Sequence, residues 1–175
     1  MKKDYVGLKR RPFLMPIWLA AIGAAAILVV VGLFAWAWST ADSTTVIVIR
    51  NAETGARAER LAQMFGDDRA PGAIDAIYVQ PTQRGRATAA PLATRLGLSA
   101  AAVGGGDARA LAKRVLADHA GGRILIVAGR HDVPLIAAAL AGTAQVPPVE
   151  EADFGTMFIV GVPRIGRPNI LRAHY

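Results

Sequence analysis

The sequence contains no cysteine among its 175 residues. Disulfide bonds and thiolate-ligated metal centres are therefore excluded. The globular part, residues 43–175, also lacks any block of lysine and arginine interleaved with aromatic residues, although the whole chain has a formal net charge of +7. Such a block is typical of nucleic-acid interfaces, so we expect no nucleic-acid partner. The glycine run at 104–106 is interpreted as a linker turn, since it lacks the Lys-Ser/Thr that follows in a phosphate-binding loop. We predict no cofactor and no metal ion.

Charged residues are also missing from one long stretch, residues 12–41. Its core, residues 17–38, is long enough to cross a hydrocarbon layer as a helix. Trp18 and Trp36 are separated by roughly 27 Å along such a helix, close to the thickness of that layer. Together with Trp38 they are predicted to lie at the two membrane interfaces. We therefore predict a single transmembrane helix over residues 13–38, in contact with the lipid bilayer.

A basic cluster precedes the predicted span, with Lys9, Arg10 and Arg11 next to it. The positive-inside rule places residues 1–12 in the cytoplasm. The rest of the chain, after a linker over residues 39–43, is then predicted to be periplasmic, on a bacterial inner membrane. A cleaved signal peptide is the alternative, because the Ala-Trp-Ala at 35–37 imitates a cleavage site, but the apolar run is longer than a typical signal core.

Apolar periodicity in the remaining sequence predicts alternating strands and helices. Strands alternating with helices at this spacing predict a three-layer α/β/α sandwich. We expect strands at 45–50, 76–79, 123–128, 156–162 and 169–172, and helices at 53–65, 84–96 with a break at Pro91, 107–119 and 132–141.

The first strand of this domain ends in a group of polar residues. A run of β-branched residues, TTVIVI at 44–49, is followed by Arg50, Asn51 and Glu53. Open α/β sheets bind ligands at the carboxyl ends of their strands. This end of the strand is therefore the first candidate for a ligand site.

Three segments in order resemble the histidine phosphatase superfamily, which has the phosphoglycerate mutase-like fold. TTVIVIRNAET at 44–54 is similar to the first block of the family, a strand that ends in Arg-His-Gly/Ala-Glu. AIYVQPTQRGRATAAPLATRLGL at 76–98 is similar to the second block, and GGRILIVAGRHDVPLIAAALAG at 121–142 to the third. The resemblance covers about residues 44–172 and corresponds in length to the small phosphohistidine phosphatases. It implies the fold of the domain at 44–175.

The same resemblance indicates that the reactive positions have changed. In the family, the histidine of the first block receives the phosphoryl group, and a second histidine and two arginines bind the phosphate. Arg50 and Arg84 match the two arginines. Asn51 stands at the nucleophile position, and an amide nitrogen is neither basic nor nucleophilic. Gly129 stands at the position of the second histidine. We therefore expect no catalytic residue.

Two further side chains are candidates for the same site. A local shift of the loop would bring His131 inward to replace the second histidine, or His131 is simply exposed. Arg130 would extend the anion site of Arg50 and Arg84. The alternative for these two arginines is a structural ion pair, for example with Glu53 or Asp132. The anion-binding candidates are therefore Arg50, Glu53, Arg84, Arg130 and His131.

These observations favour a membrane-anchored, catalytically inactive protein that acts as an accessory subunit or binding module of a membrane complex. The helix at 17–38 would contact its partners, and small residues at 20 and 23–25 allow close approach of another helix, unless they only reflect an alanine-rich composition. One alternative is a weak or altered phosphomonoesterase, in which Asn51 positions a water. The other is a sensor that binds a phosphorylated ligand with Arg50 and Arg84.

Overall fold

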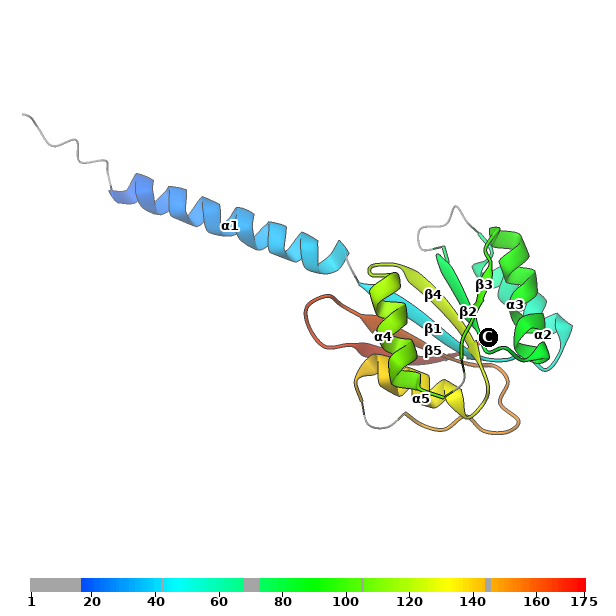
Figure 1. The fold of residues 1–175 in the computed structure, drawn as a ribbon. Coiled ribbons are helices and arrows are strands. Elements are labelled where there is room, and N and C mark those ends of the chain that lie inside the picture. Colours follow the sequence, from blue (N-terminus) through cyan, green and yellow to red (C-terminus); the bar gives the residue numbers. More distant parts are fainter. Residues whose placement is uncertain (1–16, 42, 68–72, 105, 144–145) are drawn as a thin grey trace, which may run out of the picture. The chain divides into compact units, whose positions relative to one another are not determined.

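A computed structural model describes residues 17–41, 43–67, 73–104, 106–143 and 146–175. The chain divides into two units, Met1–Trp38 and Ser39–Tyr175. The first contains most of α1 (Ile17–Ala41), a helix of 25 residues (Figure 1). Within α1 the described side chains are those of residues 22–36, and all are exposed. Lys9, Arg10 and Arg11 lie outside the described residues, and Trp18 and Trp38 belong to α1 without described side chains.

The predicted transmembrane span is not confirmed by the structure. Among the residues that the structure describes, no helix combines the length and the apolar character needed to cross a membrane.

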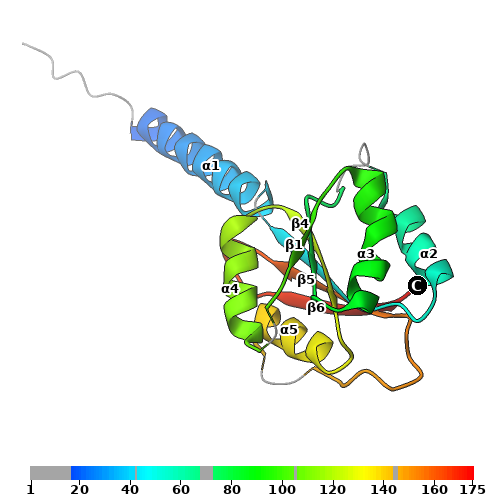
Figure 2. The same cartoon turned by 45° about the vertical axis from the view of Figure 1, so that its right-hand side comes forward.

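A six-stranded mixed sheet forms the centre of the second unit (Figures 1 and 2). Its strand order is β3-β2-β4-β1-β5-β6. The neighbours β3, β2, β4 and β1 run parallel, whereas β5 is antiparallel to both β1 and β6. The strands are β1 (Thr44–Arg50), β2 (Ala76–Val79), β3 (Ala100–Ala102), β4 (Arg123–Ala128), β5 (Thr156–Val162) and β6 (Asn169–His174).

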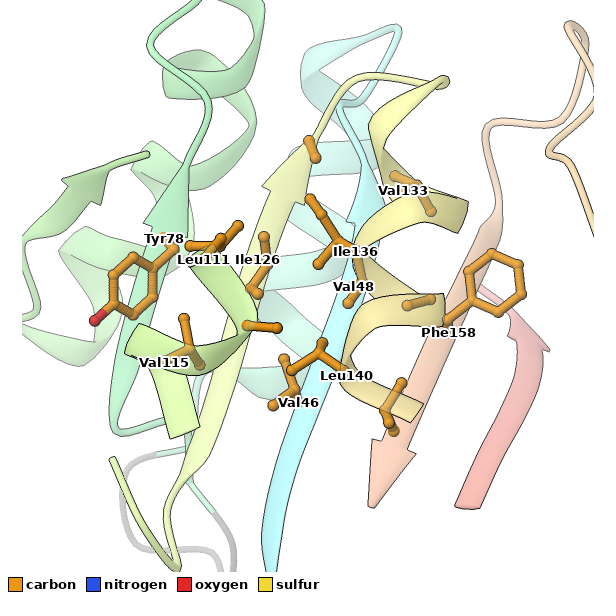
Figure 3. Close-up of a cluster of buried hydrophobic side chains, with 14 of the residues drawn as sticks. Val46, Val48, Tyr78, Leu111, Val115, Ile126, Val133, Ile136, Leu140 and Phe158 are labelled. Atoms are coloured by element: carbon orange, nitrogen blue, oxygen red, sulfur yellow. The ribbon is translucent and has the colours of Figure 1, made fainter. Parts of the chain in front are cut away.

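Two pairs of helices cover the two faces of this sheet, which confirms the three-layer prediction. The helices are α2 (Gly55–Phe65), α3 (Gln83–Leu96), α4 (Ala108–Asp118) and α5 (Asp132–Ala141). One core joins α4 and α5 to Val48, Ile126 and Phe158 of the sheet (Figure 3). The other joins α2 and α3 to Ile49 and Val127. Because all the described residues of both cores belong to the second unit, we expect that unit to fold independently.

Most predicted elements are confirmed within one or two residues. The predicted cap of α4 is present, since the Oδ1 atom of Asp107 accepts the N–H groups of Arg109 and Ala110. The helix α3 ends at Gly97, whose φ of 65° is the left-handed conformation that glycine adopts without strain.

Two predictions of local structure were wrong. The helix α3 continues through Pro91 without a break. The strand β3 was not predicted, because its three residues are alanines, which have a low intrinsic preference for strands. It forms through parallel pairing with β2 at the edge of the sheet.

Candidate functional site

The predicted site residues follow the carboxyl ends of neighbouring parallel strands. Because β1, β2 and β4 are parallel, their carboxyl ends lie side by side. The N–H of Asn51, just after β1, donates to the carbonyl of Ala128 at the end of β4, with an N···O distance of 2.9 Å. The N–H of Gln80, just after β2, donates to the carbonyl of Val127, also at 2.9 Å. The three sequence blocks thus converge on one place.

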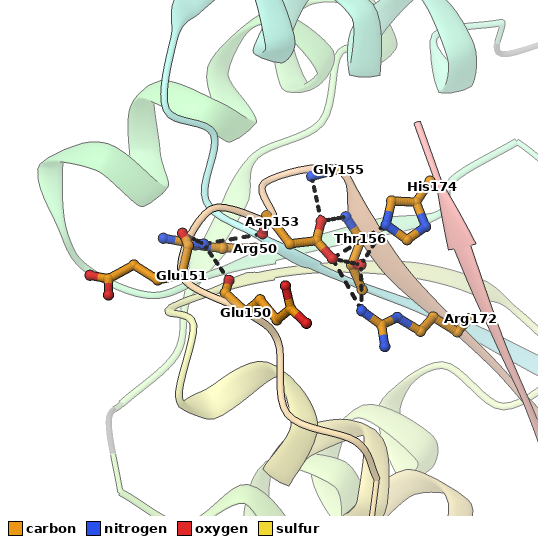
Figure 4. Close-up of polar contacts among 8 residues, drawn as sticks. All are labelled: Arg50, Glu150, Glu151, Asp153, Gly155, Thr156, Arg172 and His174. Atoms are coloured by element: carbon orange, nitrogen blue, oxygen red, sulfur yellow. Dashed lines mark hydrogen bonds and ion pairs between the residues drawn. The ribbon is translucent and has the colours of Figure 1, made fainter.

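Arg50 is committed to a loop far away in the sequence, residues 150–154 (Figure 4). Its side chain is buried, with 8% of the residue exposed. The Nη1 atom donates to the carbonyl oxygens of Glu150, Glu151 and Asp153 at 3.2, 2.7 and 3.1 Å. The guanidinium carbon lies 3.7 Å from the centroid of the Phe154 ring, in cation–π contact. The described partners of Arg50 are thus main-chain carbonyls and an aromatic ring, and an ion pair of Arg50 with Glu53 or Asp132 is not observed among them.

Both burial and neighbouring charges affect the protonation of Arg50. Burial lowers the pKa of Arg50, and the charges of Arg130 and Arg84 lower it further, whereas the carboxylates of Asp153 and Glu151 raise it. The Nε atom of Arg50 is buried without a hydrogen-bond partner among the described residues. Arg84 and Arg130 therefore lie within electrostatic reach of Arg50, and two carboxylates of the 150–154 loop partly compensate the effect of their charges on Arg50.

The residues that follow β1 are held through their main chain. Asn51 is half-buried, and Glu53 is exposed. The N–H of Ala52 donates to the hydroxyl of Thr88 at 2.8 Å, and this hydroxyl donates to the carbonyl of Arg84 at 2.8 Å. The side chain of Arg84 is exposed on α3. Thr88 thus fixes the end of β1 against α3 and leaves the guanidinium of Arg84 accessible.

Gly129, which the resemblance matches to the second histidine, lies beside a side-chain network that was not predicted. The N–H of Gly129 donates to Oε1 of Gln80 at 2.8 Å, and Nε2 of Gln80 donates to Oδ2 of Asp132 at 2.7 Å. A Cβ atom at Gly129 would lie 3.0 Å from that Oε1 atom and 3.4 Å from that Oδ2 atom. Any side chain at 129 therefore requires the end of the Gln80 side chain to shift.

We predict that Gly129→His destabilises the domain by about 1–2 kcal/mol, because it breaks the hydrogen bonds of Gln80 and leaves partly buried polar groups unpaired. In a Gln80→Ala background the same substitution is expected to cost less, since the space is already vacated. Urea unfolding of the four proteins of this double-mutant cycle measures the difference. Equal costs in both backgrounds would show that Gln80 does not occupy the histidine position.

Arg130 and His131 lie on the solvent side of this network. The Nη1 atom of Arg130 is 3.6 Å from Oε2 of Glu151, and its Nη2 atom is 3.2 Å from Nε2 of His131. His131 is exposed and directly precedes α5. The inward shift of His131 is therefore not observed. Arg130 does extend the arginine group toward the 150–154 loop, and anion binding by this group stays a prediction.

A cavity of about 50 Å³ lies beside Gln80 and Asp132. Its other walls are mainly apolar, and the two charged side chains that line it, Asp107 and Asp132, are carboxylates. A phosphate group would be repelled there, since like charges in a shielded site destabilise each other. Among the described residues, no cluster of three or more histidine and acidic side chains is placed to hold a metal ion.

The 150–154 loop is fixed at its other end by Asp153 (Figure 4). Its Oδ1 atom accepts the N–H groups of Gly155 and Thr156 at 3.1 and 2.9 Å. Its Oδ2 atom accepts the Thr156 hydroxyl, Nη2 of Arg172 at 3.1 Å and Nε2 of His174 at 3.3 Å. The loop is thus tied to β5 and β6 on one side and to Arg50 on the other.

These contacts make the stability of the domain depend on acid pH. Burial alone would raise the pKa of Asp153, but the hydrogen bonds from Thr156 and Arg172 and the charge of His174 outweigh it and lower the pKa from 3.8 to about 2. A carboxyl group whose pKa is lowered by folding stabilises the folded state at pH values above its pKa in the unfolded chain. This contribution is lost as the pH falls from about 4 to 2. It amounts to about 2 kcal/mol.

We predict that Asp153→Asn lowers stability at pH 7 by about this amount and makes the unfolding temperature depend less on pH below about 4. Thermal unfolding from pH 7 to pH 2 measures both effects, and parallel curves for the two proteins would contradict the assignment.

Comparison with known proteins finds similar folds but no matching sequence. No protein-family model and no curated protein sequence matches the chain. Among solved structures, it is similar to a phosphoglycerate mutase from Plasmodium falciparum, with a TM-score of 0.55 and 9% identity over 76% of this chain and 90% of that one. It is also similar to a structure titled mycobacterial hydrolase 2, with a TM-score of 0.55 and 13% identity over 74% of this chain and 89% of that one. The domain therefore has a phosphoglycerate mutase-like fold.

Proposed function

We propose that this chain is a membrane-anchored, non-catalytic module with a histidine phosphatase-like fold, and that it serves as an accessory subunit of a membrane protein complex. The proposal rests on the hydrogen bonds that the side chain of Arg50 makes with the 150–154 loop. The guanidinium that would bind phosphate in a phosphatase of this fold donates to three main-chain carbonyls instead.

The reaction of the superfamily needs groups that this chain lacks. An imidazole nitrogen must attack phosphorus and form a P–N bond while the alcohol leaves. Asn51 offers an amide, which has no available lone pair on nitrogen at neutral pH. A water held by Asn51 would need a base, and the side chains around Gly129 are Gln80 and an Asp132 that already accepts a hydrogen bond. Neither route to phosphoryl transfer is supported.

The 150–154 loop also competes with any phosphate for Arg50. An incoming anion would have to break three hydrogen bonds and the stacking on Phe154. The carboxylate of Glu151 near Arg130 would repel the anion as well. These contacts favour a structural role for Arg50, in which it holds the 150–154 loop, over a role in substrate binding.

Membrane attachment is supported by the composition of the N-terminal region. No charged residue occurs between 12 and 41, and α1 is helical over Ile17–Ala41. Its exposed side chains include Leu28, Val30 and Leu33, an arrangement that water does not favour. The described side chains of α1 cover residues 22–36, whereas the predicted span extends over residues 13–38. The positive-inside rule favours a periplasmic domain.

Hydrolysis of p-nitrophenyl phosphate by purified residues 43–175 tests the catalytic part of the proposal. We expect no turnover above buffer. Arg84→Ala is the control, because Arg84 is exposed and its loss leaves the fold intact. Turnover that this substitution abolishes would overturn the proposal, whereas turnover that it leaves unchanged would identify a contaminating phosphatase.

The accessory role is tested by affinity purification of the full chain in mild detergent. We expect a membrane protein to co-purify in fixed proportion and to be lost on Gly23→Leu, because a leucine blocks close helix approach. Recovery of the chain by itself, as a monomer or a homodimer, would contradict the role.

A further inference from the structure

The strand β6 (Asn169–His174) forms an outer edge of the sheet, next to β5 only (Figure 2). Strand edges left open invite pairing with another chain, and proteins usually protect them. The opposite edge, β3, is protected by its length of three residues. By contrast β6 has six residues and no proline. It is therefore the more exposed of the two edges.

The register shows which groups β6 leaves open. The N–H of Tyr175 donates to the carbonyl of Gly155, and the pairs Met157–Ala173 and Ile159–Leu171 continue the same register. In an antiparallel pair, bonded and open residues alternate. The main-chain groups of Ile170, Arg172 and His174 therefore point away from β5, toward the outside of the sheet.

Exposed apolar side chains gather at this edge. Among the described residues of 43–175, five large apolar side chains are exposed: Met64, Leu135, Ile165, Ile170 and Leu171. Three of the five belong to β6 or to the turn before it, and Leu171 is 60% exposed. Scattered single residues would need no explanation, but a group on an open strand edge marks an interaction surface.

We propose that β6 pairs with β6 of a second copy of this chain, antiparallel and centred on Leu171, to form one continuous sheet across a twofold axis. This register matches open residues with open residues, because Ile170 lies opposite Arg172 of the second copy. Leu171 then faces Leu171 of the second copy in the closely spaced type of pair and buries its exposed surface.

Charge selects this register over the neighbouring one. Centring on Arg172 would place two arginines directly opposite each other, which is destabilising. In the Leu171 register each arginine faces an isoleucine, and its charge is compensated within its own chain by Asp153 at 3.1 Å. The interface goes beyond the accessory role proposed above and does not depend on it.

Cysteine cross-linking tests the pairing, and the chain offers a clean background because it has no cysteine. Opposite residues in a non-hydrogen-bonded pair have Cα atoms about 4.5 Å apart, within the range of a disulfide. We expect Leu171→Cys in the full chain, in mild detergent with a gentle oxidant, to give mostly disulfide-linked dimer. The matched control, Ala101→Cys on the exposed opposite edge, is expected to stay monomeric. Equal cross-linking of both variants, or none in either, would overturn the proposal.

A second variant separates strand pairing from chance encounters of thiols. The N–H of Ile170 points outward, so Ile170→Pro removes an edge donor and keeps the ladder with β5. Added to Leu171→Cys, it is expected to abolish the dimer with little change in the unfolding temperature. A cross-link that persists in this variant would show that the thiols meet by another route and would overturn the proposed pairing.

Discussion

Arg50→Ala is expected to lower the free energy of unfolding of residues 43–175 by about 3 kcal/mol, which corresponds to roughly 10 °C in melting temperature. The substitution leaves three carbonyl oxygens of the 150–154 loop without their donor and removes the stacking on Phe154. Hydrogen bonds to a charged group contribute about 1.5–3 kcal/mol each, and a cation–π contact about 1 kcal/mol. The net loss is smaller than their sum, because Nε of Arg50 is buried without a hydrogen-bond partner in the described part of the chain, and the charge of Arg130 repels the guanidinium.

Two variants serve as controls for this result. Arg84→Ala removes an exposed arginine of the same cluster and is expected to change stability by less than about 0.5 kcal/mol. Arg50→Lys keeps the charge but not the planar fork, so we expect it to recover about 1 kcal/mol only. Chemical denaturation measures all three. Equal effects of the alanine substitutions at 50 and 84 would mean that Arg50 does not hold the loop.

Deletion of residues 1–38 is expected to move the protein almost completely from the membrane fraction to the soluble fraction. The segment 17–38 contains ten leucine, isoleucine, valine and phenylalanine residues. At about 0.3–0.6 kcal/mol each, they favour insertion by roughly 3–6 kcal/mol. The remaining unit, Ser39–Tyr175, has its own two cores and is expected to stay folded.

Alkaline carbonate extraction followed by blotting measures this distribution. Val30→Lys is a point-mutation control, since a lysine at the centre of a span costs about 3 kcal/mol and should release much of the full chain. If the full chain is already soluble, or if the truncated chain still resists extraction, the anchor is not where we propose it. Protease added to intact spheroplasts then tests the orientation, and we expect the domain to be cut.

The fold could be predicted from the sequence because short stretches of residues indicate its strands and helices, and the three sequence blocks follow one another in the expected order. The run RILIVA at 123–128 is apolar on both faces, as a central strand must be, and β4 indeed lies between β2 and β1. Asp107 caps α4 through its own side chain, so three neighbouring residues contain the whole signal. By contrast β3 depends on a partner strand for its conformation, and three alanines reveal nothing of that partner.

The contacts at the site could not be predicted in the same way. Arg50 is bound by carbonyls about one hundred residues later in the chain. Main-chain acceptors are offered by every residue, so no side-chain pattern indicates that the 150–154 loop would use them. The hydrogen bond between Gln80 and Asp132 was not predicted for a similar reason, since it joins the ends of two different blocks. Asn51 and Gly129 could be singled out from the sequence, whereas the groups that surround them could not.

The central claim of our proposal is that Arg50 holds the 150–154 loop and does not bind phosphate. It is tested most directly by the unfolding temperature of residues 43–175 in 10 mM phosphate and in chloride at equal ionic strength. A phosphate site with a Kd of about 0.1 mM would add about 2.7 kcal/mol under these conditions. We predict the same unfolding temperature in both buffers. A rise in phosphate that disappears in Arg84→Ala would contradict the claim and would identify the arginine cluster as a working phosphate site.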